Sequence, residues 1–150
     1  MSSCRVWFGA LSLAVSVAPA FAQQPETAAG RIKIASGSVF VVRTGGLVPA
    51  HAGQTIFEGD GLKTGADGSL GIALKDDTRV SLGPGSEVRV DQFVYASAEG
   101  RMGLVLHIVR GVVAYVSGRI AQLSPDSIRL ETPSAVMGVR GTTLVLRVTP

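Results

Sequence analysis

The chain has 150 residues, of which 46% are hydrophobic, 17% charged and 5% aromatic, and its formal net charge is +3. This length and composition are typical of one globular domain and exclude a long disordered chain. The charge surplus, 14 Lys+Arg against 11 Asp+Glu, is too small to indicate nucleic-acid binding.

The first predicted element is a secretory leader over residues 1–22. Arg5 precedes an apolar run over residues 6–17, which Pro19 and the triplet Ala20-Phe21-Ala22 follow. The run is shorter than the ~20 residues that span a bilayer, so we expect cleavage after Ala22 and no stable membrane span. A retained anchor is the alternative. Cleavage removes Cys4, the only cysteine, and thereby excludes disulfides and thiolate chemistry from the exported chain.

Residues 23–33 are predicted to be an N-terminal lead, and residues 34–150 a β domain. Apolar residues in this domain alternate with period two and are separated by turns rich in Gly, Pro and Asp. The clearest strands are residues 37–43, 70–74, 78–82, 87–91, 102–109, 111–116, 128–132 and 142–148. Turn signals every 8 to 12 residues or so are typical of a sandwich or barrel.

The predicted fold is therefore all-β, a rolled or jelly-roll-like β-sandwich of about ten short strands, without a long helix in the mature chain. A short β-solenoid is the alternative, because Gly-x-x-x-apolar-x-apolar patterns recur at Gly37, Gly68, Gly85 and Gly111. Their intervals are unequal, whereas a solenoid needs a fixed period.

Four segments carry a family resemblance. Residues 58–65 form a Gly-Asp-x-apolar-x-Thr-Gly turn, residues 68–90 two strands around an Asp-Asp-Thr turn, and residues 104–116 a Leu-rich strand with a Gly-Val-Val step. Residues 132–142 read Thr-Pro-Ser-Ala-Val-Met-Gly-Val-Arg-Gly-Thr. In this order, the segments resemble the FecR-type periplasmic domain.

The resemblance implies an exported, periplasmic location in a Gram-negative envelope. It also implies a non-enzymatic interaction or sensing module that recognises another envelope protein. The regulator that names the family has a cytoplasmic sigma-factor-binding segment and a transmembrane helix before this domain, and we expect this chain to lack both. Two alternatives are a periplasmic small-ligand or polysaccharide-binding module and a component of iron-responsive sigma-factor signalling.

The site residues predicted from the shared motifs serve as partner contacts or as a structural signature. They are Asp60, Thr64, Gly138, Arg140, Gly141 and Thr142. Arg140 has two interpretations, since flanking glycines can aim its guanidinium along an irregular turn. It either locks that turn against carbonyls or a carboxylate such as Glu131 or Asp60, or it faces an anionic ligand or partner.

No catalytic residue, cofactor or metal is predicted. Asp60, Asp76 and Asp77 lie in turns, but their spacing fits no calcium loop. His51 lies in a loop and His107 lies in a strand between apolar neighbours, so two isolated histidines do not indicate a metal site. No Gly-x-Ser-x-Gly motif is present, which argues against a hydrolase.

Overall fold

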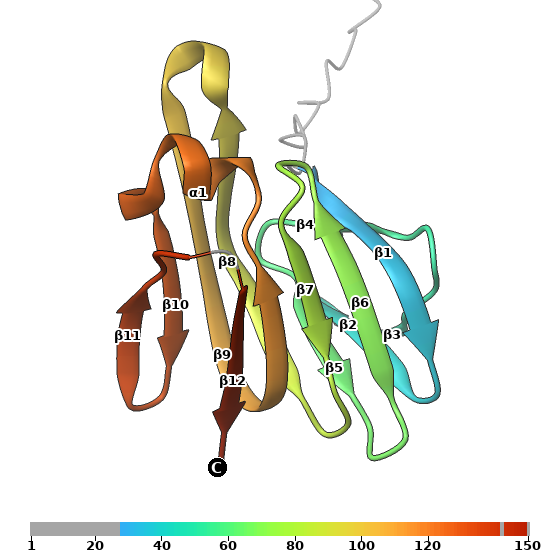
Figure 1. Ribbon diagram of the computed structural model, residues 1–150. Helices are drawn as coiled ribbons and strands as arrows, with labels where there is room; N and C mark the ends of the chain where they lie inside the picture. Colours follow the sequence, from blue (N-terminus) through green and yellow to red (C-terminus); the bar gives the residue numbers. More distant parts are fainter. Residues whose placement is uncertain (1–27, 142, 150) are drawn as a thin grey trace, which may run out of the picture.

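The structure is a computed structural model that describes residues 28–141 and 143–149 (Figure 1). The predicted leader lies outside the described residues. The strands are β1 (Ala28–Ser36), β2 (Val39–Arg43), β3 (Gly46–Pro49), β4 (Thr55–Phe57), β5 (Gly61–Thr64), β6 (Ser69–Leu74), β7 (Arg79–Leu82), β8 (Glu87–Ala96), β9 (Arg101–Val116), β10 (Ile128–Thr132), β11 (Ala135–Gly138) and β12 (Thr143–Val148). The helical elements are η1 (Ser97–Glu99), α1 (Arg119–Leu123) and η2 (Pro125–Ser127).

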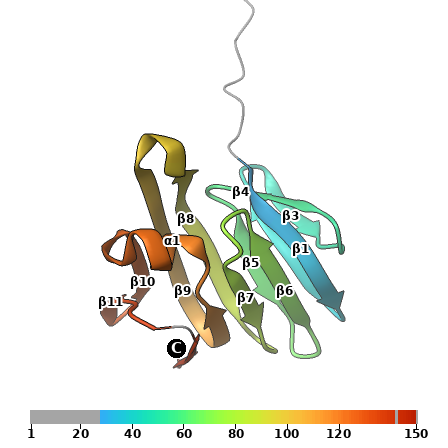
Figure 2. The same cartoon turned by 45° about the horizontal axis from the view of Figure 1, so that its top comes forward.

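The strands form one 12-stranded sheet that is curled into a half-barrel (Figures 1 and 2). The long strand β9 divides it into two halves. The β6 half has the order β12–β9–β7–β6–β1–β4, and the β8 half has the order β3–β2–β5–β8–β9–β10–β11. All these pairs are antiparallel except β9 with β10.

Gly111 marks the point where β9 passes from one half to the other. The strand pairs with β8 up to Arg110 and with β12 from Gly111 onward. Gly111 has φ +95, and a Cβ atom there would lie 2.3 Å from the Ser86 hydroxyl oxygen, so only glycine fits. The buried Ser86 hydroxyl accepts from the Val112 N–H at 3.0 Å and donates to the Val112 carbonyl at 3.1 Å. This glycine therefore lets one strand serve both halves.

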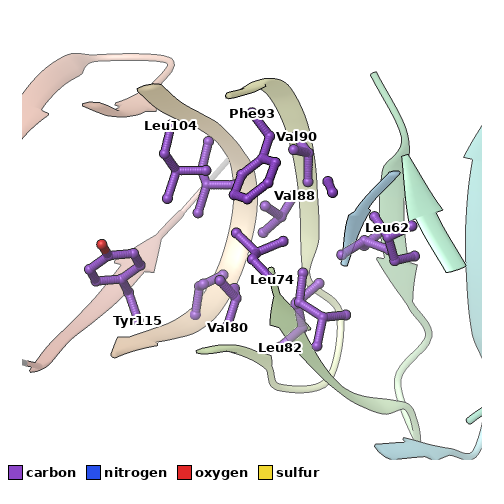
Figure 3. Close-up of a cluster of buried hydrophobic side chains, with 14 of the residues drawn as sticks. Leu62, Leu74, Val80, Leu82, Val88, Val90, Phe93, Leu104 and Tyr115 are labelled. Carbon is purple, nitrogen blue, oxygen red and sulfur yellow. The ribbon is translucent and has the colours of Figure 1, made fainter. Parts of the chain in front are cut away.

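The core lies between the inner faces of the two halves. Side chains alternate between the two faces of each strand, and the apolar ones on the inner face fill the core. Leu74, Val80 and Leu82 come from β6 and β7, while Val88 and Phe93 come from β8 (Figure 3). Burying each such side chain contributes about 1.5–3 kcal/mol relative to leaving it exposed. The half-barrel is held by this packing, in keeping with a domain built without disulfides.

The all-β prediction is confirmed, and the roll takes the form of a half-barrel rather than a solenoid. The described residues contain twelve strands where about ten were expected. Strands of three or four residues, such as β3, β4 and β11, are too short to show an alternating pattern. Residues 28–33, which the sequence assigns to a lead, form the first part of β1 and pair with β6 and β4.

The helical content of the described residues is small. The α-helix α1 has five residues, which agrees with the expectation of no long helix. No helix within residues 28–141 and 143–149 has the length and apolar character needed to cross a membrane.

Candidate functional site

Asp60 lies in the turn between β4 and β5, and its carboxylate is the centre of a buried polar cluster. The Arg43 Nε donates to its two oxygens at 3.0 and 3.1 Å, and Arg43 Nη2 donates to Oδ2 at 2.9 Å. The Phe57 N–H also donates to Oδ2, at 2.9 Å. Arg43 further donates to the Thr55 carbonyl at 2.8 Å and lies over the Phe57 ring. Asp60 therefore joins β2, β4 and β5.

Thr64 closes a second buried cluster at the other end of β5. Its hydroxyl donates to the Gly83 carbonyl at 2.6 Å and accepts from the Ser86 N–H at 2.9 Å. Its own N–H donates to the Ser86 carbonyl at 2.9 Å. Thr64 is 2% exposed. It therefore ties β5 to the turn before β8 and offers no surface to a partner.

Asp76 anchors a third buried cluster. Its carboxylate accepts from the Thr78 hydroxyl at 2.7 Å, the Thr78 N–H at 3.2 Å and the Ile120 N–H at 3.3 Å, which fastens α1 to the β6–β7 turn. Gly118 is required there, because a Cβ atom would lie 2.3 Å from the Asp76 carbonyl oxygen. Burial, and next the charge of Asp76, raise the pKa of Tyr115 to about 12.

Arg140 lies in the connection between β11 and β12, and it is exposed. Its Nη2 atom is 3.3 Å from Asp126 Oδ1, and the two side chains are 84% and 87% exposed. Val139, which precedes it, is 6% exposed and anchors the connection in the core. Gly141 has φ +147, a conformation that favours glycine. Thr142 lies outside the described residues.

The carboxylate beside Arg140 is neither of the two that the sequence suggested. Glu131 and Asp60 were the expected partners, whereas Asp126 of η2 is the observed one. Asp60 is already bound by Arg43, and Glu131 faces His107 at the neighbouring strand. The pairing depends on where η2 folds back against the β11–β12 connection.

The predicted site residues do not form one site. Asp60 and Thr64 lie at β5, which β8, β9 and β10 separate from β11 in the β8 half. Among the predicted site residues that the structure describes, those on the surface are Gly138, Arg140 and Gly141, at the end of β11 and in the connection that follows it.

A surface hollow of about 470 Å³ lies beside this connection. Its lining includes Arg140 and Asp126 together with Arg129, Val136 and Gly138. Val136 is 67% exposed, and an added Cβ at Gly138 would meet nothing within 4 Å. Among the described residues β11 pairs with β10 alone, so no strand is paired with its other edge. Figure 1 shows β11 at this end of the sheet.

Two other hollows lie in the β6 half: one of about 460 Å³ is lined by β1, β4 and β6, and one of about 430 Å³ is lined by β1, β6 and β7. Their lining includes Arg31, Lys33, Lys75 and Arg79. No aromatic residue is among the described residues that line these two hollows, whereas exposed aromatic side chains would favour glycan binding.

Sequence reasoning missed one cluster of metal-ligating types. Asp91, His107 and Glu131 each place a ligand atom within 4.8 Å of the others, and they are half-buried. Arg89 hydrogen-bonds to Asp91, and this bond together with the charge of Asp91 raises the pKa of Arg89. Within its strand His107 has apolar neighbours, as expected, but its acidic neighbours come from β8 and β10. Only the strand pairing could have revealed them.

A comparison with known protein families shows to which family the chain belongs. Residues 60–150, more than half of the chain, match the FecR protein family. The chain belongs to the FecR family. The predicted resemblance is thus confirmed, and the FecR match begins at Asp60 and includes β5 to β12, with β1 to β4 before it. A search of the curated proteins found no match, and a search of the solved structures found none either.

Proposed function

We propose that this FecR domain is a non-enzymatic interaction or sensing module of the cell envelope that recognises another envelope protein at β11 and the hollow beside Arg140. The observation that carries the proposal is the surface position of the described part of the signature segment, residues 132–141. Its Val136 and Arg140 side chains are 67% and 84% exposed, while Asp60 and Thr64 are enclosed by internal hydrogen bonds.

The edge of β11 suits an extended segment of a partner protein. A strand that adds to a sheet edge gains main-chain hydrogen bonds, and nearby side chains supply specificity. Val136 offers an apolar contact beside the edge, and the hollow offers space for a partner side chain. Arg129 and Arg140 against Asp126 leave one net positive charge in this lining, which favours a partner segment with a carboxylate.

The location and the non-catalytic role are supported by the family and by the side chains themselves. Proteins with FecR domains sit in the envelope, and the predicted leader of this chain would export it. Arg140, the exposed charged residue of the signature, carries a permanent positive charge that suits binding rather than proton transfer.

Site-specific photocrosslinking tests the proposal. A photoreactive amino acid at Val136 is expected to capture a protein in the envelope of the native host, and the yield is expected to fall in a chain that also carries Arg140→Ala. Ile34 of β1, an apolar side chain that is 62% exposed and lies in the β6 half of the sheet, is the matched control position. Equal capture at both positions, or no protein adduct at Val136, would contradict the proposal.

A blocking substitution gives a second readout at the same surface. Gly138→Gln should fill the hollow without a clash, because the space around Gly138 is open. The expected result is unchanged thermal stability with loss of the Val136 adduct. Adduct formation at the normal yield would show that the hollow is not part of the contact.

A further inference from the structure

The outer face of the β8 half carries a second cluster, which borders the proposed partner surface because Glu131 is directly opposite Val136 in the β10–β11 pair. Asp91 of β8, His107 of β9 and Glu131 of β10 meet there on three neighbouring strands. His107 Nδ1 lies 3.7 Å from Glu131 Oε2 and 4.0 Å from Asp91 Oδ2. Both carboxylates therefore approach the same imidazole nitrogen.

The strand register explains this convergence. Glu131 is directly opposite His107 in the parallel pair of β9 and β10. On the other side, the β8–β9 register shifts between Val90 and Gln92, so that Asp91 is the extra residue of a bulge. A bulge re-aims the side chain that it carries, and here it places the Asp91 carboxylate near the imidazole. All three side chains project from paired strands, which are rigid supports.

The donor set fits a divalent transition-metal ion. One imidazole nitrogen and two carboxylate oxygens suit such an ion, and the two carboxylates balance its charge. Distances of 3.7 and 4.0 Å are too long for direct hydrogen bonds. Two atoms that bind the same ion at about 2.1 Å lie closer together than this, by roughly 1 Å or less. Small side-chain rotations would therefore bring the imidazole nitrogen and the carboxylate oxygens to coordination distance.

The surroundings of the cluster allow an ion to enter, and they place a competing cation, Arg89, beside Asp91. The three side chains are 26% to 30% exposed, so an ion could enter and water could complete its coordination. Arg89 hydrogen-bonds to Asp91 through Nε and also through Nη2, at 3.3 Å. Its side chain is 53% exposed and is free of close packing over much of its surface. The guanidinium thus competes with a metal ion for this carboxylate.

We propose that Asp91, His107 and Glu131 form a binding site for one divalent transition-metal ion, with Arg89 as the competing cation. The ion would hold β8, β9 and β10 together on the outer face of the sheet.

Calorimetric titration of the tag-free exported chain with Zn²⁺ tests the site. The expected result is binding of one ion per chain, weakened at least about tenfold by His107→Ala and by Glu131→Gln. His51→Ala is the matched control, because it removes the other histidine of the chain from an exposed loop. Arg89→Gln is expected to tighten binding, because it removes the competing charge.

A spectroscopic readout separates coordination from unspecific association. Co²⁺ should give ligand-field absorption bands that differ from those of aqueous Co²⁺ with the unaltered chain and with His51→Ala, whereas with Glu131→Gln the spectrum should stay close to that of aqueous Co²⁺. Thermal unfolding without metal shows whether each variant is folded. If His107→Ala does not fold, the near-isosteric Glu131→Gln still tests the site. Absence of Zn²⁺ binding by the unaltered chain, or equal weakening by His51→Ala, would overturn the proposal.

Discussion

Two arginine–aspartate pairs occupy the two signature turns of this FecR domain, and they differ in burial. Arg43 and Asp60 meet at three short distances, and the Asp60 side chain is 6% exposed. Arg140 and Asp126 meet at one distance of 3.3 Å, and both side chains are more than 80% exposed. The same two residue types therefore have different roles in the two turns.

The difference follows from solvent screening. An exposed pair contributes about 0–1 kcal/mol, because water screens the attraction and ordering two side chains costs entropy. Loss of one partner from a buried pair costs about 3–5 kcal/mol, because the other charge remains without compensation. The Asp60 turn is accordingly structural, and the Arg140 turn is available for recognition.

Asp60→Ala is expected to produce the largest effect. It removes the carboxylate that binds Arg43 and the Phe57 N–H. Because the Arg43 side chain that remains is 32% exposed, the free energy of unfolding should fall by about 2–4 kcal/mol, less than for a fully buried pair. Urea unfolding followed by circular dichroism measures this change, and Asp126→Ala is the matched control at the exposed pair. Similar losses in both variants would remove the contrast between the two turns.

Thr64→Val should have an intermediate effect. Valine nearly preserves the shape of threonine but leaves the Ser86 N–H and the Gly83 carbonyl without the hydroxyl, at a cost of about 1–3 kcal/mol. The same unfolding measurement applies, with Thr44→Val as a control at an exposed turn. A loss below the error of the Thr44→Val measurement would mean that this buried cluster is not needed for stability.

Arg140→Ala should have the smallest effect on stability, within about 0.5 kcal/mol, because the pair is exposed. Capture of a partner at Val136 should nevertheless fall. Arg140→Lys keeps the charge but loses the planar fork, so reduced capture with unchanged stability would show that the guanidinium geometry matters. A large loss of stability in either variant would mean that this turn, like the one at Asp60, is structural.

Local patterns were sufficient for the fold class and much of the core. Leu70, Ile72 and Leu74 alternate with Gly71 and Ala73, and this pattern alone predicts β6 and its buried face. Short strands such as β4 and β11 carry too few residues for such a pattern. The strand pairing was also beyond local analysis, since a period of two does not say which strands become neighbours.

The amino-acid sequence by itself determined the all-β class, the turns and the motifs by which the chain is identified as a FecR domain, because alternation and turn chemistry are local properties. The tertiary structure alone decided that Asp60 is enclosed by Arg43, that Arg140 faces Asp126 at the surface, and that His107 meets carboxylates from two other strands. These contacts join residues far apart in the chain, and the register of the curled sheet brings them together.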